Sequence, residues 1–434
     1  MTALPRRDFA IVFAVLLVVA MGNTALQSIL PALGRALRLP DIAVALFFSL
    51  SALVWTFAAP RWARRSDHEG RKRIMLVGLT GFAVATLAGA AVVFAGQSGW
   101  LAPALLVGLL ALARAVFGLF GSATMPAAQA YVASRTSREE RTAALAQLTS
   151  AFGLGTILGP ALAPFFVLPG VRLAGPLFVF GLLGLAALLL LRRGLPDDRG
   201  VPAGADGAKG AAAAMPSIGG APSGASAVAA AAERSPVRLS WRDPRVRPWI
   251  LFGALAANAQ AAAGQTLGFL IIDRLAMQPE AAQSFIGIAL MAGAGAALLA
   301  QWGLIRTLNL RPPQLLRWGA MLASAGLALL SLANGYHAII VAFALACAGF
   351  GFTRPGFAAG ASLAVARGEQ GTVAGLVTAV NGGAFIVAPA IGIALYAVDP
   401  HAPFLLSTLL MAVLALWAWR GAAFARLDAP RVRA

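Results

Sequence analysis

Long apolar stretches, separated by short charged segments, follow one another along most of the 434 residues of the chain. A helix needs about 20 consecutive apolar residues to cross the hydrocarbon of a bilayer, so this pattern predicts an all-α membrane protein with twelve spanning helices. Because that number is even, both termini are expected on the same side of the membrane. The predicted spans are 9–31, 42–62, 74–95, 101–125, 142–168, 173–191, 248–272, 283–305, 315–334, 337–358, 372–397 and 402–419.

The densest cluster of charge lies between the second and third predicted spans, in the sequence Ser66-Asp67-His68-Glu69-Gly70-Arg71-Lys72-Arg73. Such a cluster cannot enter hydrocarbon, because charged side chains are costly there. We therefore expect a loop in water at this segment, acting as a hinge between two membrane helices.

The basic residues bracket the apolar runs and do not gather on one polar face, although the formal net charge is +18. This distribution favours a role in setting membrane topology and not in binding nucleic acid. On the predicted map, 28 of the 34 Lys and Arg residues fall in the termini and even-numbered loops, four fall in the odd-numbered loops, and Arg114 and Arg354 lie inside spans. The positive-inside rule therefore predicts that both termini lie in the cytoplasm. We expect a multi-pass protein of a bacterial-type inner membrane.

Composition excludes several other classes of protein. With 59% hydrophobic and 12% charged residues, the chain is not a water-soluble globular protein. The single cysteine, Cys347, lies in an apolar run, so neither a disulfide framework nor a thiolate metal site is available. The chain has no G-x-x-x-x-G-K-[ST] phosphate loop for ATP. No cofactor and no metal is predicted, and the run from Phe9 to Leu30 is expected to be a retained span and not a signal peptide.

The predicted spans fall into two halves. Between Gly194 and Ser240 the sequence is rich in Ala, Gly, Pro and Ser, which predicts a disordered cytoplasmic linker. It separates an N-terminal six-helix bundle, 1–193, from a C-terminal bundle with a short tail, 241–434.

The two halves also repeat one another in sequence. The residues Pro126, Glu140, Gly153 and Pro160 recur as Pro355, Glu369, Gly382 and Pro389, each 229 positions later, while Trp62 and Arg71 recur as Trp302 and Arg311 after 240 positions. Six spans separate the equivalent residues, so the halves have the same orientation. This indicates the parallel pseudo-twofold arrangement of transporters that rock two halves about a central site.

Three motifs, in the right order, resemble those of one family. The segment Pro60–Lys72 is similar to the signature between the second and third spans of the major facilitator superfamily, with Ala63 where glycine is usual. The segment Leu110–Gly118 is similar to its fourth-span motif. The segment Gly155–Ala163 resembles the fifth-span motif of its twelve-helix drug:proton antiporters, with Ala163 replacing a glycine. The resemblance covers the chain apart from the linker and implies two pseudo-symmetric bundles of six helices.

The resemblance implies gating roles for two groups of residues. Asp67 and Arg71, within the run that also holds Gly70 and Lys72, are expected to form a charge-assisted latch that stabilises the outward-open state. The fifth-span residues Gly155, Gly159 and Pro160 imply a helix that approaches its neighbour closely and bends. Simple enforcement of topology by the first group, and ordinary close packing by the second, are the alternative interpretations.

Arg114 lies near the middle of the fourth predicted span. An unpaired guanidinium there is costly and normally faces a cavity or a partner. The resemblance implies that it takes part in proton coupling or substrate binding. Asn23 and Gln27 share one face of the first span, and Asn258 and Gln265 share one face of the seventh, so we expect these amides to contact Arg114 or substrate. Hydrogen bonding between helices explains them almost as well.

The acidic residues depart from the pattern of proton-coupled relatives, because none of the 16 lies in mid-span. Asp41 and Asp273, near the predicted outer mouth, are candidates to carry protons, and Asp67 is another. Alternatively, Arg114 together with Arg354 attracts an anionic substrate. The sequence does not choose between these mechanisms.

Taken together, these features predict a monomeric secondary transporter, not an enzyme. We expect it to export a small amphipathic compound by alternating access in proton antiport, with substrate, protons and the lipid bilayer as partners and no nucleic acid. The alternative is an exporter or facilitator of an anionic metabolite, sugar or siderophore. A membrane-bound enzyme or a sensor is disfavoured, since no nucleophiles, metal ligands or carboxylates converge at one depth.

Overall fold

The computed structural model describes residues 4–136, 138–196, 240–366 and 369–425, except for the side chains of a few residues, Asp67 among them. These residues are almost entirely helical, with a single isolated β-bridge between Leu168 and Arg172. Most of the linker predicted over 194–240 lies outside the described residues.

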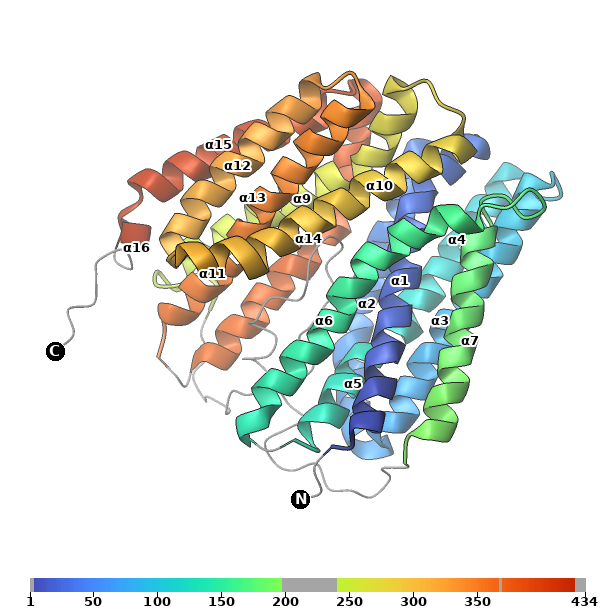
Figure 1. Cartoon of the computed structure of the whole chain (residues 1–434), viewed down its shortest axis with the longest axis horizontal. Coiled ribbons are helices and arrows are strands. Elements are labelled where there is room, and N and C mark those ends of the chain that lie inside the picture. Colours follow the sequence, from blue (N-terminus) through green and yellow to red (C-terminus); the bar gives the residue numbers. More distant parts are fainter. Residues whose placement is uncertain (1–3, 137, 197–239, 367–368, 426–434) are drawn as a thin grey trace.

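The first half of the chain forms six long helical segments (Figure 1). Two consist of more than one element: the fourth segment is α4, a five-residue π-helix η1 and α5, and the fifth is α6 followed by a short 3-10 helix η2. The elements are α1 (Arg6–Ala36), α2 (Asp41–Glu69), α3 (Arg71–Gln97), α4 (Pro103–Val116), η1 (Phe117–Gly121), α5 (Thr124–Ala133), α6 (Arg138–Leu162), η2 (Ala163–Phe166) and α7 (Gly175–Gly194).

The second half forms six further long segments and a short terminal helix. Its second segment is interrupted by a π-helix, η4. The elements are α9 (Arg247–Arg274), α10 (Pro279–Leu298), η4 (Leu299–Leu304), α11 (Ile305–Leu308), α12 (Pro312–Leu332), α13 (Tyr336–Leu363), α14 (Gln370–Val398), α15 (Ala402–Arg420) and α16 (Ala422–Ala425).

The twelve predicted spans correspond to these twelve segments, most of which extend a few residues beyond the predicted ends. In the described part, eleven helices are long and apolar enough to cross a membrane, and the remaining segment contains the shorter apolar helix Ser150–Phe166. Prolines at the starts of α4, α10 and α12 fit the first helical turn, where no backbone N–H is needed. The all-α membrane fold is confirmed.

The junction between α2 and α3 differs from the predicted loop at 66–73. Helix α2 continues to Glu69 and α3 begins at Arg71, so Gly70 alone separates them. Gly70 has φ = 95°, a backbone conformation that a residue without Cβ adopts readily. The charged residues extend the two helices because charge keeps a segment out of hydrocarbon without preventing it from being helical.

The helices form two groups, α1–α7 and α9–α15, which approach each other at one end and diverge toward the N-terminus (Figure 1). We call the first the Arg35 end, since it contains Arg35 and Asp273, and the opposite one the Gly70 end. One cluster of buried apolar side chains joins both groups; its members from the first half, such as Ile29 and Leu173, lie toward the Arg35 end. Toward the Gly70 end, a second cluster consists of residues 11–195 alone. The shared core therefore lies at the Arg35 end.

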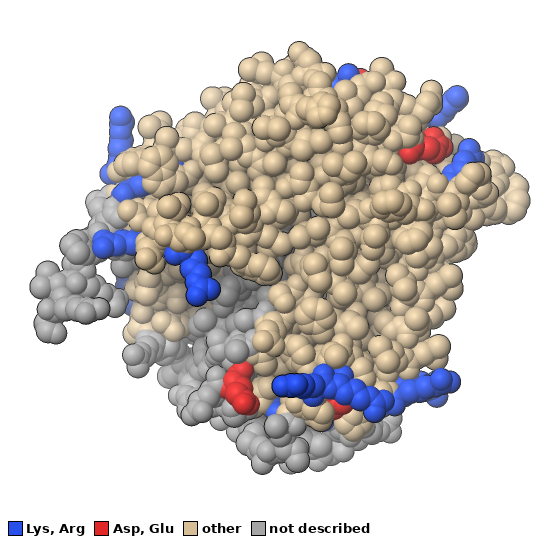
Figure 2. Space-filling view, in the orientation of Figure 1, with Lys and Arg blue, Asp and Glu red and all other residues tan. Residues whose placement is uncertain are grey.

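Basic side chains gather at the edges of the molecule, and a broad region between them carries almost no charge (Figure 2). Large apolar side chains are exposed on several helices, among them Leu112, Leu329 and Val413. An uncharged, apolar belt of this kind is what a surface in contact with lipid hydrocarbon requires.

Candidate functional site

Arg114 is the centre of the most unusual environment in the described part of the chain. It lies in the last turn of α4, just before η1, and is only 7% exposed. One terminal nitrogen, Nη2, donates to Ser51 Oγ at 2.8 Å and to Asn23 Oδ1 at 3.3 Å. The guanidinium lies over the rings of Phe48 and Phe117, 5.1 and 4.7 Å from their centroids. Neutral dipoles and aromatic faces thus surround the cation.

No described carboxylate lies within ion-pair distance of Arg114, and its Nε atom is buried without a hydrogen-bond partner. A cation so poorly compensated is expensive to keep at membrane depth. A buried cation of this kind therefore suggests that Arg114 binds a further group, such as a ligand. The pairing with Asn23 agrees with the expectation from the sequence; Ser51 and the two stacked rings carried no signal that singled them out.

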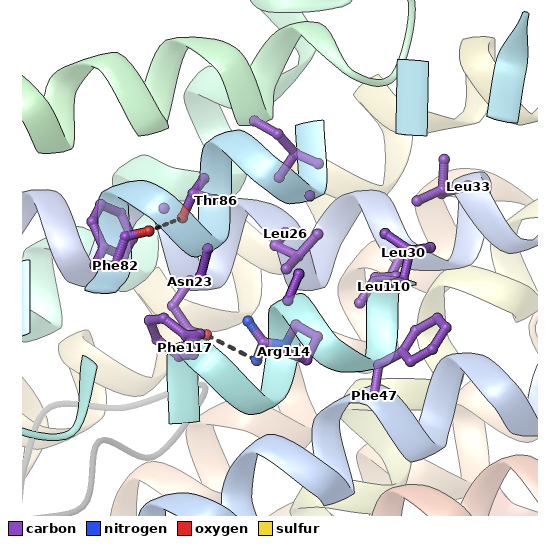
Figure 3. A pocket seen from close by; sticks show the side chains of 15 residues that line it. Asn23, Leu26, Leu30, Leu33, Phe47, Phe82, Thr86, Leu110, Arg114 and Phe117 are labelled. Atoms are coloured by element: carbon purple, nitrogen blue, oxygen red, sulfur yellow. Dashed lines mark hydrogen bonds between the residues drawn. The ribbon is translucent and has the colours of Figure 1, made fainter. Parts of the chain in front are cut away.

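A cavity of about 30 Å³ lies beside Arg114 (Figure 3). Its walls are mainly apolar, with Leu26, Phe82 and Leu110 among them, and Thr86 is one of the few polar residues. It is lined by α1, α2, α3, α4, η1 and α7, and so lies inside the N-terminal group of helices. A space of this size holds about one or two water molecules, which is enough to extend the polar network of Arg114.

A second cavity, of about 40 Å³, lies between the two groups of helices. Gln27, Thr24 and Pro160 line it from the first half, and Gln260 and Phe350 from the second. The structure therefore brings the predicted residues Gln27 and Pro160 to the shared interface. Sequence reasoning missed Gln260. It lies four residues before Gly264 on α9, so the two share one helical face, and both line this cavity.

The other two predicted amides do not border either cavity. Asn258 donates to the carbonyl of Ala254 in its own helix, at 2.8 Å. Gln265 is 5% exposed, and its Nε2 has no hydrogen-bond partner in the described part. The expected contact of these residues with substrate therefore finds no support in their geometry, because the face they share is not the face of α9 that lines the interface cavity.

Asp41 and Asp273 meet at the Arg35 end. Arg35 Nη2 lies 2.8 Å from Asp273 Oδ2 and 3.1 Å from Asp41 Oδ2, so one guanidinium is shared by two carboxylates. The Tyr396 hydroxyl donates to Asp273 at 2.9 Å, and Arg35 lies over the ring of Phe269. The cluster joins α1 and α2 to α9 and α14. Sequence reasoning identified both carboxylates but missed Arg35 and Tyr396.

A second polar contact crosses the same end. Gln283 Nε2 on α10 donates to Ser28 Oγ on α1 at 3.0 Å, and both side chains are fully buried. Close backbone approach accompanies it: a Cβ on Gly287 would lie 2.5 Å from the carbonyl oxygen of Pro160. These contacts hold the two groups of helices together at the Arg35 end.

At the Gly70 end, the predicted gating residues lie around the α2–α3 junction. Arg71 is buried, at 2% exposure, and Lys72 Nζ donates to the carbonyl of Leu195 after α7. The side chain of Asp67 lies outside the described residues, so the predicted latch between Asp67 and Arg71 stays a prediction. In the same turn of α2, a hydrogen bond from Arg65 holds the pKa of Glu69 below its ordinary value.

The predicted glycines of the fifth segment pack against α1. A Cβ on Gly155 would lie 2.5 Å from Ala20 Cβ, and one on Gly159 would lie 2.4 Å from the carbonyl oxygen of Met21. Thr24 Oγ1 also lies 3.1 Å from the carbonyl oxygen of Gly155, to which it donates. These glycines allow α6 and α1 to approach closely, within one group of helices and not across the interface.

In the second half, Arg245 holds the start of α9 to the start of α14. Its guanidinium donates to both carboxylate oxygens of Glu369, at 2.9 and 3.0 Å, and also to Asp243. The hydrogen bonds from Arg245 hold the pKa values of Glu369 and Asp243 below their ordinary values. Glu369 is the repeat counterpart of Glu140, and both follow a proline-containing span.

A sequence profile of the Major Facilitator Superfamily matches residues 12–389 of the chain. The chain belongs to this superfamily, and it is therefore a multi-pass membrane transporter and not an enzyme. This confirms the family that the three motifs indicated.

Two relatives in sequence are drug-resistance proteins. The chain is 35% identical over 150 residues to the multi-drug resistance efflux pump PmrA homolog of Lactococcus lactis, a match that covers 34% of this chain and 33% of that protein. It is 35% identical over 156 residues to the class D tetracycline resistance protein of Salmonella ordonez, covering 35% of this chain and 36% of that protein. These matches span about a third of the length of each relative.

Solved structures share the fold over most of the chain. The human organic anion transporter MFSD10 (TETRAN) superposes with a TM-score of 0.61 at 20% identity. The nucleoside transporter NupG superposes with a TM-score of 0.69 at 11% identity. Each covers 96% of this chain and 100% of the other. At these identities the similarity establishes the major facilitator fold alone.

Proposed function

We propose that this transporter exports a small amphipathic, drug-like compound from the cytoplasm by alternating access, in exchange for protons. The buried and poorly compensated cation of Arg114, beside a cavity with mainly apolar walls, is the observation that carries this proposal. The cavity holds only one or two water molecules in this conformation, so we infer that it widens when a compound binds. Its apolar walls then accept the hydrophobic part of the compound, while the guanidinium and the nearby amide of Asn23 orient the polar part. The two relatives named as drug-resistance proteins are consistent with this substrate class.

The contacts between the halves support a conformation closed at the Arg35 end. With the termini in the cytoplasm, as the basic residues predict, this end faces outward and the Gly70 end faces the cytoplasm. A compound then enters from the cytoplasm, and export requires that the contacts of Arg35, Ser28 and Gln283 break while new ones form at the Gly70 end. The residues Asp67, Gly70, Arg71 and Lys72 are placed in sequence to form those contacts.

Asp41 and Asp273 are the proposed proton carriers. Two carboxylates share one guanidinium, so protonation of either removes part of the attraction that joins α1 and α2 to α9. Protons from outside would therefore favour opening of the outer end, where substrate leaves. Antiport follows if substrate release and proton uptake use the same open state.

Arg114 also favours a second candidate, the export or facilitated transport of an anion. In the described part of the chain the guanidinium has only neutral partners, and a carboxylate or phosphate on the substrate would complete its pairing. This candidate needs no proton-carrying carboxylate.

Transport by the purified protein in proteoliposomes distinguishes the candidates. We expect export of cationic or neutral amphipathic compounds to rise several-fold when an inward proton gradient is imposed. In Asp273→Asn transport should become nearly indifferent to the gradient. The control is Asp399→Asn, which removes a carboxylate at the same end that has no ion pair in the described part, and it should respond as the wild type does.

Transport of anions alone, indifferent to the gradient, would replace antiport by the second candidate. A normal gradient response in both Asp41→Asn and Asp273→Asn would remove these carboxylates from the mechanism.

A further inference from the structure

A groove of about 570 Å³ runs along α2 where it packs against η1, and it is much larger than the two cavities near the transport path. Leu53, Phe57 and Leu119 form its apolar walls, and Arg61, Trp62 and Arg65 lie toward one end. It lies apart from both Arg114 and the cavity between the two halves, and the transport mechanism makes no use of it.

The apolar walls face away from the protein core. Leu53, Phe57 and Leu119 are 42%, 61% and 42% exposed. On α2 they continue a stripe of exposed apolar residues that begins at Ile42 and Leu46, and on the fourth segment Leu112 and Leu119 are seven residues, or two turns, apart. In a protein that spans the membrane, such a stripe contacts lipid acyl chains, so the groove opens to the bilayer and not to water.

The other end of the groove is cationic. Arg61 Nη1 donates to the carbonyl oxygen of Phe57 at 2.6 Å, and in the described part of the chain no carboxylate lies within ion-pair distance of Arg61. Arg65 lies over the ring of Trp62, 5.5 Å from its centroid, and pairs with Glu69. Each guanidinium has five N–H donors, so these contacts leave donors on both side chains for a further anion.

Trp62 gives the groove a fixed floor. Its Nε1 donates to the carbonyl oxygen of Leu119 at 2.6 Å, and its ring packs against Phe120. Leu119 lies in the π-helix η1, where the wider turn disturbs the regular pattern of backbone hydrogen bonds. The indole therefore ties α2 to a carbonyl of η1, which also accepts a hydrogen bond from Ser122 Oγ at 2.8 Å.

We propose that this groove binds an anionic glycerophospholipid of the leaflet at the Gly70 end. Arg61 and Arg65 bind its phosphate, Trp62 lies at the level of the head group, and an acyl chain lies along Leu53, Phe57 and Leu119. From Arg61 to Leu53 the helix rises by about 12 Å, which matches the first half of an acyl chain. A free phosphate would satisfy the arginines but leave the apolar walls without a partner. With the termini in the cytoplasm, the lipid belongs to the inner leaflet.

Lipid retention by the purified full-length protein tests this site. Phosphatidylglycerol, phosphatidylcholine with the same acyl chains, and inorganic phosphate are titrated into delipidated protein, and bound lipid is measured by native mass spectrometry. We expect preference for phosphatidylglycerol, and a loss of its affinity by about tenfold or more in the double variant Arg61→Gln/Arg65→Gln. The matched variant Arg64→Gln, on the same helical turn but outside the groove, should bind as the wild type does.

The variant Leu53→Gln tests the apolar wall separately. It should weaken binding of both lipids while the preference for phosphatidylglycerol persists. The melting temperature of the lipid-free protein reports whether the double variant folds. If it does not, Leu53→Gln tests the site by itself. Unchanged phosphatidylglycerol binding in the double variant, equal binding of the two lipids by the wild type, or displacement of phosphatidylglycerol by equimolar inorganic phosphate would each overturn the proposal. Because binding is measured without transport, these outcomes do not depend on the proposed substrate or proton coupling.

Discussion

The two halves repeat one sequence plan, but they differ in chemistry at equivalent positions. Counting back from the repeat pair Pro126 and Pro355, the counterpart of Arg114 is Phe343, or Ala344 if the additional residue of the π-turn η1 is allowed for. In α13 the same stretch is regular α-helix. The N-terminal half thus has a buried cation where the C-terminal half has an apolar side chain.

Close packing differs between the halves in the same way. Gly155 and Gly159 correspond to Ala384 and Ala388 at the repeat offset of 229. The glycines lie where a Cβ would clash with α1, whereas the two alanines are buried in a small apolar cluster that also includes Phe385. The two halves therefore share the course of their helices, while at these equivalent positions the buried cation and the glycine contacts occur in the N-terminal half. Elsewhere in the C-terminal half, Gly326 and Gly349 bring α12 and α13 equally close. The N-terminal half is expected to bind and orient substrate, and the C-terminal half to close over it.

Replacing Arg114 should produce the largest difference between the halves. Arg114→Ala removes the charge-assisted hydrogen bonds to Ser51 and Asn23, and hydrogen bonds to charged groups contribute about 1.5–3 kcal/mol. If they orient substrate, transport in proteoliposomes should fall by roughly tenfold to a hundredfold. The counterpart variant Phe343→Leu, which keeps an apolar side chain in the interface cavity that Phe343 lines, should retain most of the activity. Equal losses in both variants would contradict a site confined to the N-terminal half.

A smaller difference is expected from added methyl groups. In Gly159→Ala the new Cβ would lie 2.4 Å from the backbone oxygen of Met21, which cannot move without shifting α1. Overpacking of this kind costs about 1–3 kcal/mol, so the melting temperature should fall. Gly383→Ala in α14 is the matched control, because no atom lies within 4 Å of the Cβ position there. It should be neutral or stabilising by up to about 1 kcal/mol. A stable Gly159→Ala protein would show that the two halves are equally tolerant.

The smallest effect is expected at Glu369. Its pKa is held below the ordinary value by Arg245, so the folded state binds its proton less readily than the unfolded chain does. The resulting stabilisation is complete above the ordinary pKa and is lost as the pH falls through the depressed one, between about pH 5 and pH 3. Melting curves of Glu369→Gln should therefore show a shallower decline over this range than those of the wild type.

Glu280→Gln is the control for that experiment, since Glu280 makes no ion pair in the described part of the chain. Its pH dependence should match that of the wild type. If the melting temperature of Glu369→Gln declined with pH as steeply as that of the wild type, the contact between Glu369 and Arg245 would not stabilise the C-terminal half.

The spans were predictable because each one is a continuous apolar run between charged or Gly- and Pro-rich segments. The prediction erred at 66–73, where charge was taken to end a helix. Charge only excludes a segment from hydrocarbon, and the backbone at Glu69 and Arg71 remains helical on both sides of Gly70. The π-turns at Phe117–Gly121 and Leu299–Leu304 left no recognisable pattern in the sequence.

Parts of the candidate site were predictable where a residue type is rare in its position in the membrane. Arg114 was found because a cation in mid-span is rare, and Asp41 and Asp273 because few acids lie near spans. Their partners Ser51, Arg35 and Tyr396 are ordinary residues for their positions, and only the packing of distant helices brings them together. Gln260 and Asn258 could not be ranked without knowing how α9 is rotated.

The joint at Gly70 has a mechanical consequence. A linker of one residue leaves little freedom between the helices, so a rotation of α2 must be transmitted to α3. The two helices should therefore move as one rigid body whenever the transporter changes state. Inserting a few glycines at this position would let α2 and α3 rotate independently, and a displacement of α2 would then no longer be transmitted to α3.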